Sequence, residues 1–179
     1  MLISTTLAAV PLTSKIARGI PVKDPLTFPF MISIEKISSN EQFCGAVFYP
    51  PHFLITAAHC SNDVVLQDLV VYGSRPNRSD TTTGIAMKVI KIDRHPLYNS
   101  TTSVYDAAVW TLSDSVMPQQ PEIVLESGDV QGNAMIAGWG ALYGDPMLRT
   151  NQLNQQTVCY LTWHITPIYS IGCYGESLA

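Results

Sequence analysis

A stretch bounded by two cysteines constrains this chain most, because it specifies a short hairpin with a candidate cross-link at its open end. Residues 44–48 and 53–56 are apolar runs of strand-forming residues, and a Pro-Pro turn at residues 50–51 separates them. Antiparallel strands joined by a short turn bring their far ends together, so we expect Cys44 and Cys60 within disulfide reach. Such a cross-link favours an oxidising compartment.

His59 lies at the end of this hairpin and is a candidate general base. Histidine changes protonation state near neutral pH, and a ring held beside a covalent link keeps one orientation. The alternative is a structural histidine, which is the commoner case after an apolar strand. A zinc site from His52, His59, Cys44 and Cys60 is not favoured, because adjacent residues of a strand point in different directions and the spacing fits no usual zinc finger. We therefore expect no metal.

Length and charge exclude several classes of partner. The chain has 179 residues, 46% of them hydrophobic, and a formal net charge of −4. This length suits one domain or two small packed lobes. A mildly acidic chain without a basic cluster gives no reason to expect nucleic acid or an anionic membrane surface as a partner. No apolar run approaches the length that spans a bilayer.

The rest of the chain reads as short strands. Residues 28–34, 68–73 and 85–92 have strand composition, and a polar loop at residues 74–83 separates the last two. No long stretch has helical periodicity. Many short strands with Gly and Pro turns between them predict an all-β sandwich or barrel.

Asp106 immediately precedes the apolar strand expected at residues 107–112. A carboxylate buried there needs a partner, because burying it unpaired costs several kcal/mol. The ring of His59 is the economical candidate, since a carboxylate that accepts from one ring nitrogen leaves the other as a base. The alternative is an ordinary aspartate at the start of a strand.

Several ordered motifs resemble the trypsin-like serine proteases, which have the chymotrypsin fold. The run Leu-Ile-Thr-Ala-Ala-His-Cys at residues 54–60 resembles the histidine motif of that family. His-Pro-Leu-Tyr-Asn at residues 95–99, followed by Asp-Ala-Ala-Val-Trp-Thr-Leu at 106–112, is similar to its aspartate motif. Residues 134–140, which end in Gly-Trp-Gly, resemble the strand that opens the second barrel, and residues 152–159 look like the strand after it.

This resemblance implies a fold of two antiparallel Greek-key β-barrels, of which the second is truncated. Residues 1–15 are then a leader or pro-segment, and residues 16–179 form the peptidase domain. Within it, we expect the first barrel at about 16–112, a linker at about 113–131 and a partial second barrel at about 132–179.

The resemblance also implies a secreted serine endopeptidase that acts on a polypeptide substrate or meets a protein inhibitor, and it implies no cofactor. The run Cys-Tyr-Gly-Glu-Ser at residues 173–177 resembles the nucleophile motif. On that alignment His59 is the general base, Asp106 orients it, and Ser177 is the nucleophile. The backbone N–H groups of Gly175 and Ser177 then form the oxyanion hole.

A second alignment removes the nucleophile from the chain. Residues 165–175 are also similar to an earlier Ile-Thr…Cys-Ala-Gly segment of the family, and Ser177 is then an ordinary serine. The chain is expected to have weak activity or none. The alternative function is a non-catalytic homologue that binds proteins. Cys159 matches no familiar cysteine position, so its pairing with Cys173 stays open.

The resemblance also implies an activation cleavage, and two sequons agree with secretion. Cleavage after Lys15 of a zymogen would free Ile16, whose ammonium would pair with Glu176; the alternative is a plain basic residue in an exposed leader. Asn77 and Asn99 each begin an Asn-X-Ser/Thr sequon and are candidate glycosylation sites.

Overall fold

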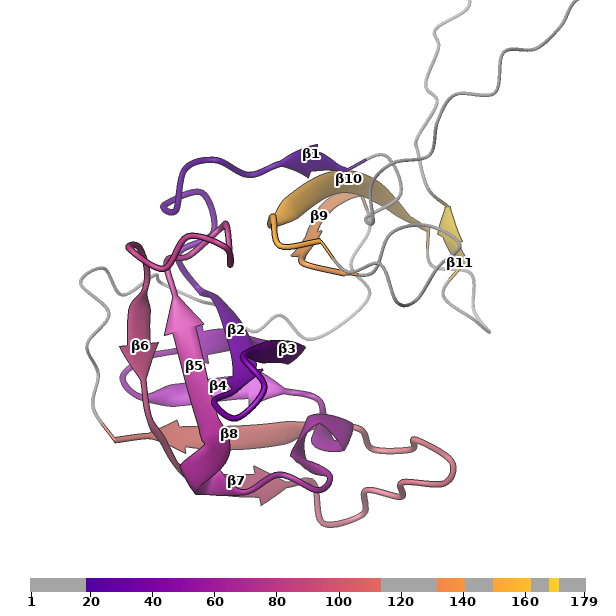
Figure 1. Ribbon diagram of the computed structural model, residues 1–179. Coiled ribbons are helices and arrows are strands. Elements are labelled where there is room, and N and C mark those ends of the chain that lie inside the picture. Colours follow the sequence, from indigo (N-terminus) through magenta and orange to yellow (C-terminus); the bar gives the residue numbers. More distant parts are fainter. Residues whose placement is uncertain (1–18, 114–131, 141–149, 162–167, 171–179) are drawn as a thin grey trace, which may run out of the picture. The chain divides into compact units, whose positions relative to one another are not determined.

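The computed structural model describes residues 19–113, 132–140, 150–161 and 168–170, and within them almost all regular structure is antiparallel strand (Figure 1). The chain divides into two compact units. The described part of one unit comprises residues 22–113 with 151–153. The described part of the other comprises residues 19–21, 132–140, 150, 154–161 and 168–170.

A curled seven-stranded antiparallel sheet makes up the larger unit, in the order β6-β5-β2-β3-β4-β8-β7 (Figure 1). The sheet curls far enough for β5 and β7 to come into contact, although they are not neighbours in this order. Its strands are β2 (Met31–Lys36), β3 (Glu41–Tyr49), β4 (Phe53–Thr56), β5 (Leu69–Gly73), β6 (Ile85–Met87), β7 (Val89–Arg94) and β8 (Ala108–Leu112).

The core lies inside this curled sheet, because alternate residues of each strand point to the same face. On β8, Trp110 is fully buried whereas its neighbour Val109 is exposed. Ile32, Phe48 and Leu54 on β2, β3 and β4 are also fully buried. Burying a side chain of this kind contributes about 1.5–3 kcal/mol, so these side chains hold the sheet in its curled form.

Helix is confined, in the described residues, to two 3₁₀ turns, η1 (Ala58–Ser61) and η2 (Leu66–Asp68). Neither turn, nor any other described segment, is a helix that could cross a membrane. The predicted all-β class is therefore confirmed. One strand differs from expectation: residues 85–92 form two strands, because β6 pairs with β5 and β7 pairs with β8. The change of partner interrupts the ladder at Lys88.

The smaller unit is also antiparallel. In it β9 (Gly132–Gly138) pairs along most of β10 (Asn154–Leu161), which agrees with the strands expected from residues 134–140 and 152–159. Near the start of β10, β1 (Ile20–Pro21) adds two residues, and near its end β11 (Ile168–Ser170) adds three.

A buried ion cluster lies at the end of β2 in the larger unit. Glu35 is 2% exposed and accepts hydrogen bonds from the guanidinium groups of Arg75 and Arg78 and from the hydroxyl of Ser33. Burial is the largest single effect and raises the pKa of the Glu35 carboxyl, but the hydrogen bond and charge of Arg75, together with the hydrogen bonds from Ser33 and Arg78, outweigh it, so the pKa is lowered. The cluster links β2 to the loop after β5.

Candidate active site

The hairpin of β3 and β4 forms as the sequence predicts and brings the two cysteines together. Val47 pairs with Ile55 and Tyr49 with Phe53 across the Pro-Pro turn. At the open end, Cys44 and Cys60 form a disulfide, with their Cα atoms 6.0 Å apart. The disulfide therefore joins β3 to the chain that follows β4.

His59 lies in the 3₁₀ turn η1 rather than at the end of a strand as expected. The ladder of β4 stops at Thr56, whose partner is Ala108. After it the chain turns, and the backbone N–H of Cys60 donates to the carbonyl of Ala57. A hydrogen bond from the core stabilises the turn: the indole N–H of the buried Trp110 donates to the Ser61 hydroxyl at 3.0 Å.

Asp106 and His59 meet through two hydrogen bonds. The carboxylate accepts from the backbone N–H of His59 at 2.7 Å through Oδ1 and from its ring Nδ1 at 2.7 Å through Oδ2. Sheet pairing explains the meeting: Ala108 begins β8 opposite Thr56, so the residues just before one and just after the other lie side by side. The structure thus brings together the two residues that the sequence paired.

The pair is partly open to solvent. The side chain of His59 is 57% exposed and that of Asp106 is 26% exposed. The hydrogen bond from the His59 ring, followed by the one from its backbone, holds the pKa of the Asp106 carboxyl below its usual range. An ionised carboxylate can only accept hydrogen bonds, so Nδ1 carries the proton and Nε2 is the unprotonated nitrogen of the neutral ring.

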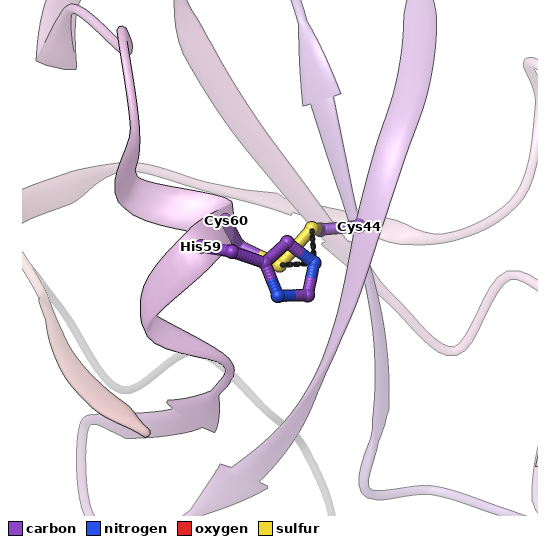
Figure 2. Close-up of side chains that lie close together, drawn as sticks. All are labelled: Cys44, His59 and Cys60. Atoms are coloured by element: carbon purple, nitrogen blue, oxygen red, sulfur yellow. Dashed lines mark hydrogen bonds between the residues drawn. A yellow bond between two sulfur atoms is a disulfide. The ribbon is translucent and has the colours of Figure 1, made fainter. Parts of the chain in front are cut away.

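Nε2 of His59 faces the disulfide. It lies 3.9 Å from the sulfur of Cys44 and 3.6 Å from that of Cys60, as the dashed lines in Figure 2 show. Disulfide sulfur carries no proton. Among the described residues, Nε2 therefore has no hydrogen-bond donor, and in the neutral ring it remains a proton acceptor.

The same view bears on the zinc alternative (Figure 2). The ligand atoms of Cys44, His59 and Cys60 all lie within 4.8 Å of one another. His59 and Cys60 lie in a 3₁₀ turn rather than in a strand, so the expectation that their side chains point apart is wrong. His52 is not in the group; its ring packs against Phe53. In the disulfide neither sulfur is a thiolate, so the oxidised group has only one nitrogen to offer a metal.

Other site residues from the sequence fall outside this geometry. Ile16, Gly175 and Ser177 lie outside the described residues, as do Cys173 and the side chain of Cys159. Their roles stay predictions. Both sequon asparagines, by contrast, are described and exposed: Asn77 lies after β5, and Asn99 lies between β7 and β8.

His95, which belongs to the aspartate motif as a structural residue, supports the pair through a contact with Tyr105 that the sequence did not predict. The ring of His95 stacks on that of Tyr105 with centroids 4.9 Å apart, and the His95 N–H donates to the carbonyl of Ala107. These contacts fix the chain on both sides of Asp106. The Tyr105 backbone has a φ of 57°, which no local sequence signal indicates for a tyrosine.

Comparison with known proteins agrees with this geometry. A family model described as Trypsin matches residues 18–164. Over 164 residues the chain is 29% identical to transmembrane protease serine 9 of Rattus norvegicus, covering 86% of this chain and 15% of that protein. It is 28% identical to a trypsin of Simulium vittatum, covering 68% of this chain and 52% of that one.

The fold has a counterpart among solved structures. The structure of the VesB protease of Vibrio cholerae matches with a TM-score of 0.66 at 22% identity, over 80% of this chain and 44% of that one. At this identity the match shows the β-barrel fold alone. The chain spans about half the length of the trypsin it matches, or less of longer relatives. Since the family model covers most of its residues, the chain belongs to the trypsin family of serine proteases.

Proposed function

We propose that the protein containing this chain is a secreted serine endopeptidase that hydrolyses peptide bonds in polypeptides. The two hydrogen bonds from His59 to Asp106 carry the proposal, because they orient the ring and leave Nε2 as the proton acceptor. Membership of the trypsin family supports the reaction class. The disulfide between Cys44 and Cys60 supports an extracellular location, where such bonds persist.

In the proposed reaction His59 first accepts a proton as a general base and then donates it as a general acid. A serine hydroxyl gives its proton to Nε2 as its Oγ attacks the scissile carbonyl carbon, and the imidazolium then gives that proton to the leaving amine. In the second half, water gives a proton to Nε2 as its oxygen attacks the acyl carbon, and the imidazolium returns that proton to the serine Oγ as the ester bond breaks. Asp106 stays ionised throughout and stabilises the imidazolium, a role that its lowered pKa supports.

The nucleophile is assigned from sequence alone. Ser177 is the proposed nucleophile, with the N–H groups of Gly175 and Ser177 stabilising the oxyanion. Cleavage after Lys15 would free the ammonium of Ile16 to pair with Glu176 and order this loop. The competing assignment puts the nucleophile in sequence after Ala179.

Labelling with a fluorophosphonate probe tests the proposal, because the probe reacts covalently only with an activated serine. The 179-residue chain, cleaved after Lys15, is compared with the longest product of the same gene, each beside its Ser177→Ala and His59→Ala variants. Labelling that depends on His59 supports the enzyme, and loss in Ser177→Ala identifies the nucleophile. Labelling of the longer product alone moves the nucleophile beyond Ala179. No labelling of either folded protein overturns the proposal and favours a protein-binding homologue.

A further inference from the structure

The loop between β7 and β8 carries a sequon close to the candidate active site. Asn99 follows Tyr98, whose hydroxyl accepts a hydrogen bond from the Asn62 side chain at 3.3 Å. Asn62 in turn caps the turn η1 that holds His59, and its side-chain oxygen accepts from Arg94 at 3.4 Å. A group attached at Asn99 therefore lies one residue from a contact with the turn that carries His59.

The side chain of Asn99 is presented in a defined way. Its Oδ1 accepts from the backbone N–H groups of Thr101 and Thr102 at 2.9 and 3.1 Å. The backbone N–H of Asn99 donates to the carbonyl of Val104 at 3.1 Å, and this bond closes the loop. Asn99 and Thr101 are both exposed. With Oδ1 engaged, Nδ2 has no partner among the described residues and is accessible to an enzyme.

We propose that Asn99 carries an N-linked glycan. The Asn99-Ser100-Thr101 sequon has the required pattern, and Nδ2 is the atom that would bond the sugar. In the transfer a bond forms between Nδ2 and the anomeric carbon of a lipid-diphosphate-linked oligosaccharide. The bond from that carbon to the diphosphate oxygen breaks, the lipid diphosphate leaves, and Nδ2 loses one proton to the transferase. The inference rests on the proposed secretion, because the donor is met in the secretory pathway.

A polar pocket beside the sequon would accommodate the first sugars. It has a volume of about 460 Å³, and its lining includes Asn62, Arg94, Tyr98 and Ser100. Amide, guanidinium and hydroxyl groups suit the hydrogen-bonding hydroxyls of a sugar. Because Ser100 is the neighbour of Asn99, a glycan at Asn99 would begin beside this pocket, whose lining residue Asn62 caps the turn that carries His59.

The second sequon, at Asn77, provides a control for the one at Asn99. The two residues after Asn77 both bind residues outside the sequon. The hydroxyl of Ser79 accepts a hydrogen bond from the Asn151 amide at 2.7 Å, and Arg78 pairs with the buried Glu35. The backbone of Asn77 also pairs with Gln152. In the folded protein this sequon is part of a paired segment, whereas residues 99–103 form their hydrogen bonds, within the described part of the chain, only with residues of the same loop.

Translation of the full 179-residue chain behind a secretory signal sequence, in the presence of microsomes, tests the inference. Protection from added protease scores translocation, and a gel shift reversed by endoglycosidase H scores the glycan. Asn99→Gln and Thr101→Ala are expected to abolish one shift of the protected chain. Thr101→Ser is expected to retain it, because serine also completes a sequon, and Asn77→Gln is expected to leave it in place.

Separate outcomes distinguish this inference from the proposed enzyme. A protected chain with no shift that depends on Asn99 overturns the glycan and leaves the fluorophosphonate result untouched. Mass spectrometry of the peptide containing Asn99 locates the sugar directly. Failure of the probe to label any form of the protein would overturn the enzyme and leave the glycan standing.

Discussion

His59 and Asp106, 47 residues apart in the chain, are joined by two hydrogen bonds to one carboxylate, one from the backbone N–H and one from the ring of the histidine. The backbone bond ties the carboxylate to the turn itself. The ring then needs only to rotate into line with an acceptor that is already in place. Asp106 therefore both stabilises η1 and determines which ring nitrogen carries the proton.

Asp106→Asn is expected to reverse the tautomer of His59. An amide that keeps the backbone bond with its oxygen presents its NH₂ group to the ring, so Nδ1 must become an acceptor and Nε2 must carry the proton. ¹⁵N NMR of the ring measures this exchange directly. In an active form of the protein, peptidase activity should fall on the order of 10⁴-fold. Asp93→Asn, at an exposed carboxylate paired with Lys91, is the matched control. An unchanged ring spectrum in Asp106→Asn would refute the assignment.

Removal of the disulfide is expected to weaken the hairpin without changing its core. Cys44 and Cys60 are 16 residues apart, and closing a loop of this size stabilises a fold by about 3 kcal/mol. Urea unfolding of the Cys44→Ser/Cys60→Ser double variant should show that loss as a lower midpoint with a similar slope. Under reducing conditions the wild-type chain and the double variant should unfold at the same midpoint. Equal midpoints for the oxidised wild type and the variant would contradict the expected role of the bond.

The sequence predicts much of the larger unit because its strongest signals are local. The hairpin at residues 44–60 is specified by apolar strands, a Pro-Pro turn and a cysteine at each end. The pairing of Asp106 with His59 follows from a carboxylate that needs a partner and from the family resemblance. What could not be predicted depends on long-range contacts. No local pattern shows that Glu35, inside a strand, meets Arg75 and Arg78 some 40 residues later.

The 3₁₀ turn of His59 illustrates the same limit. The strand predicted at residues 53–56 ends at Thr56, as β4 does, but the prediction puts His59 at its end, whereas the chain turns first and His59 lies in η1. The turn depends on contacts with distant residues, such as the bonds from His59 to Asp106 and from Trp110 to Ser61, so the sequence around His59 does not reveal it. That error also led to the wrong expectation that His59 and Cys60 point apart.

Glu35→Gln is expected to destabilise the larger unit strongly. Glutamine keeps the shape of the side chain but removes the charge that offsets the buried guanidinium of Arg75, and breaking a buried ion pair in this way costs about 3–5 kcal/mol. Asp63→Asn, which removes an exposed carboxylate where the backbone φ of 53° also suits asparagine, is the control. Similar unfolding free energies for the two variants at neutral pH would show that the cluster contributes little.

The stability contributed by Glu35 should also depend on pH. Its pKa is lowered in the folded state, so the unfolded chain binds the proton more readily, and stability falls as the pH drops through the acid range toward the folded-state pKa. The gap in unfolding free energy between wild type and Glu35→Gln should therefore narrow on acidification. Urea midpoints at a series of pH values measure it. A gap that stays constant or widens toward low pH would have the wrong sign.

Gly84→Ala is expected to disturb the ion cluster by displacing Arg75. Gly84 has a φ of 91°, and a Cβ added there would lie 2.7 Å from the Cβ of Arg75. The strained backbone alone costs about 1–3 kcal/mol, and the contact pushes Arg75 away from Glu35. Gly45→Ala is the matched control, because its new Cβ would meet only the Ile32 carbonyl oxygen at 3.6 Å, an ordinary contact. The unfolding midpoint should fall clearly in the first variant and little in the second. Equal midpoints would mean that the loop after β5 yields to the extra methyl group, and that Arg75 is not held against Glu35 by this close approach.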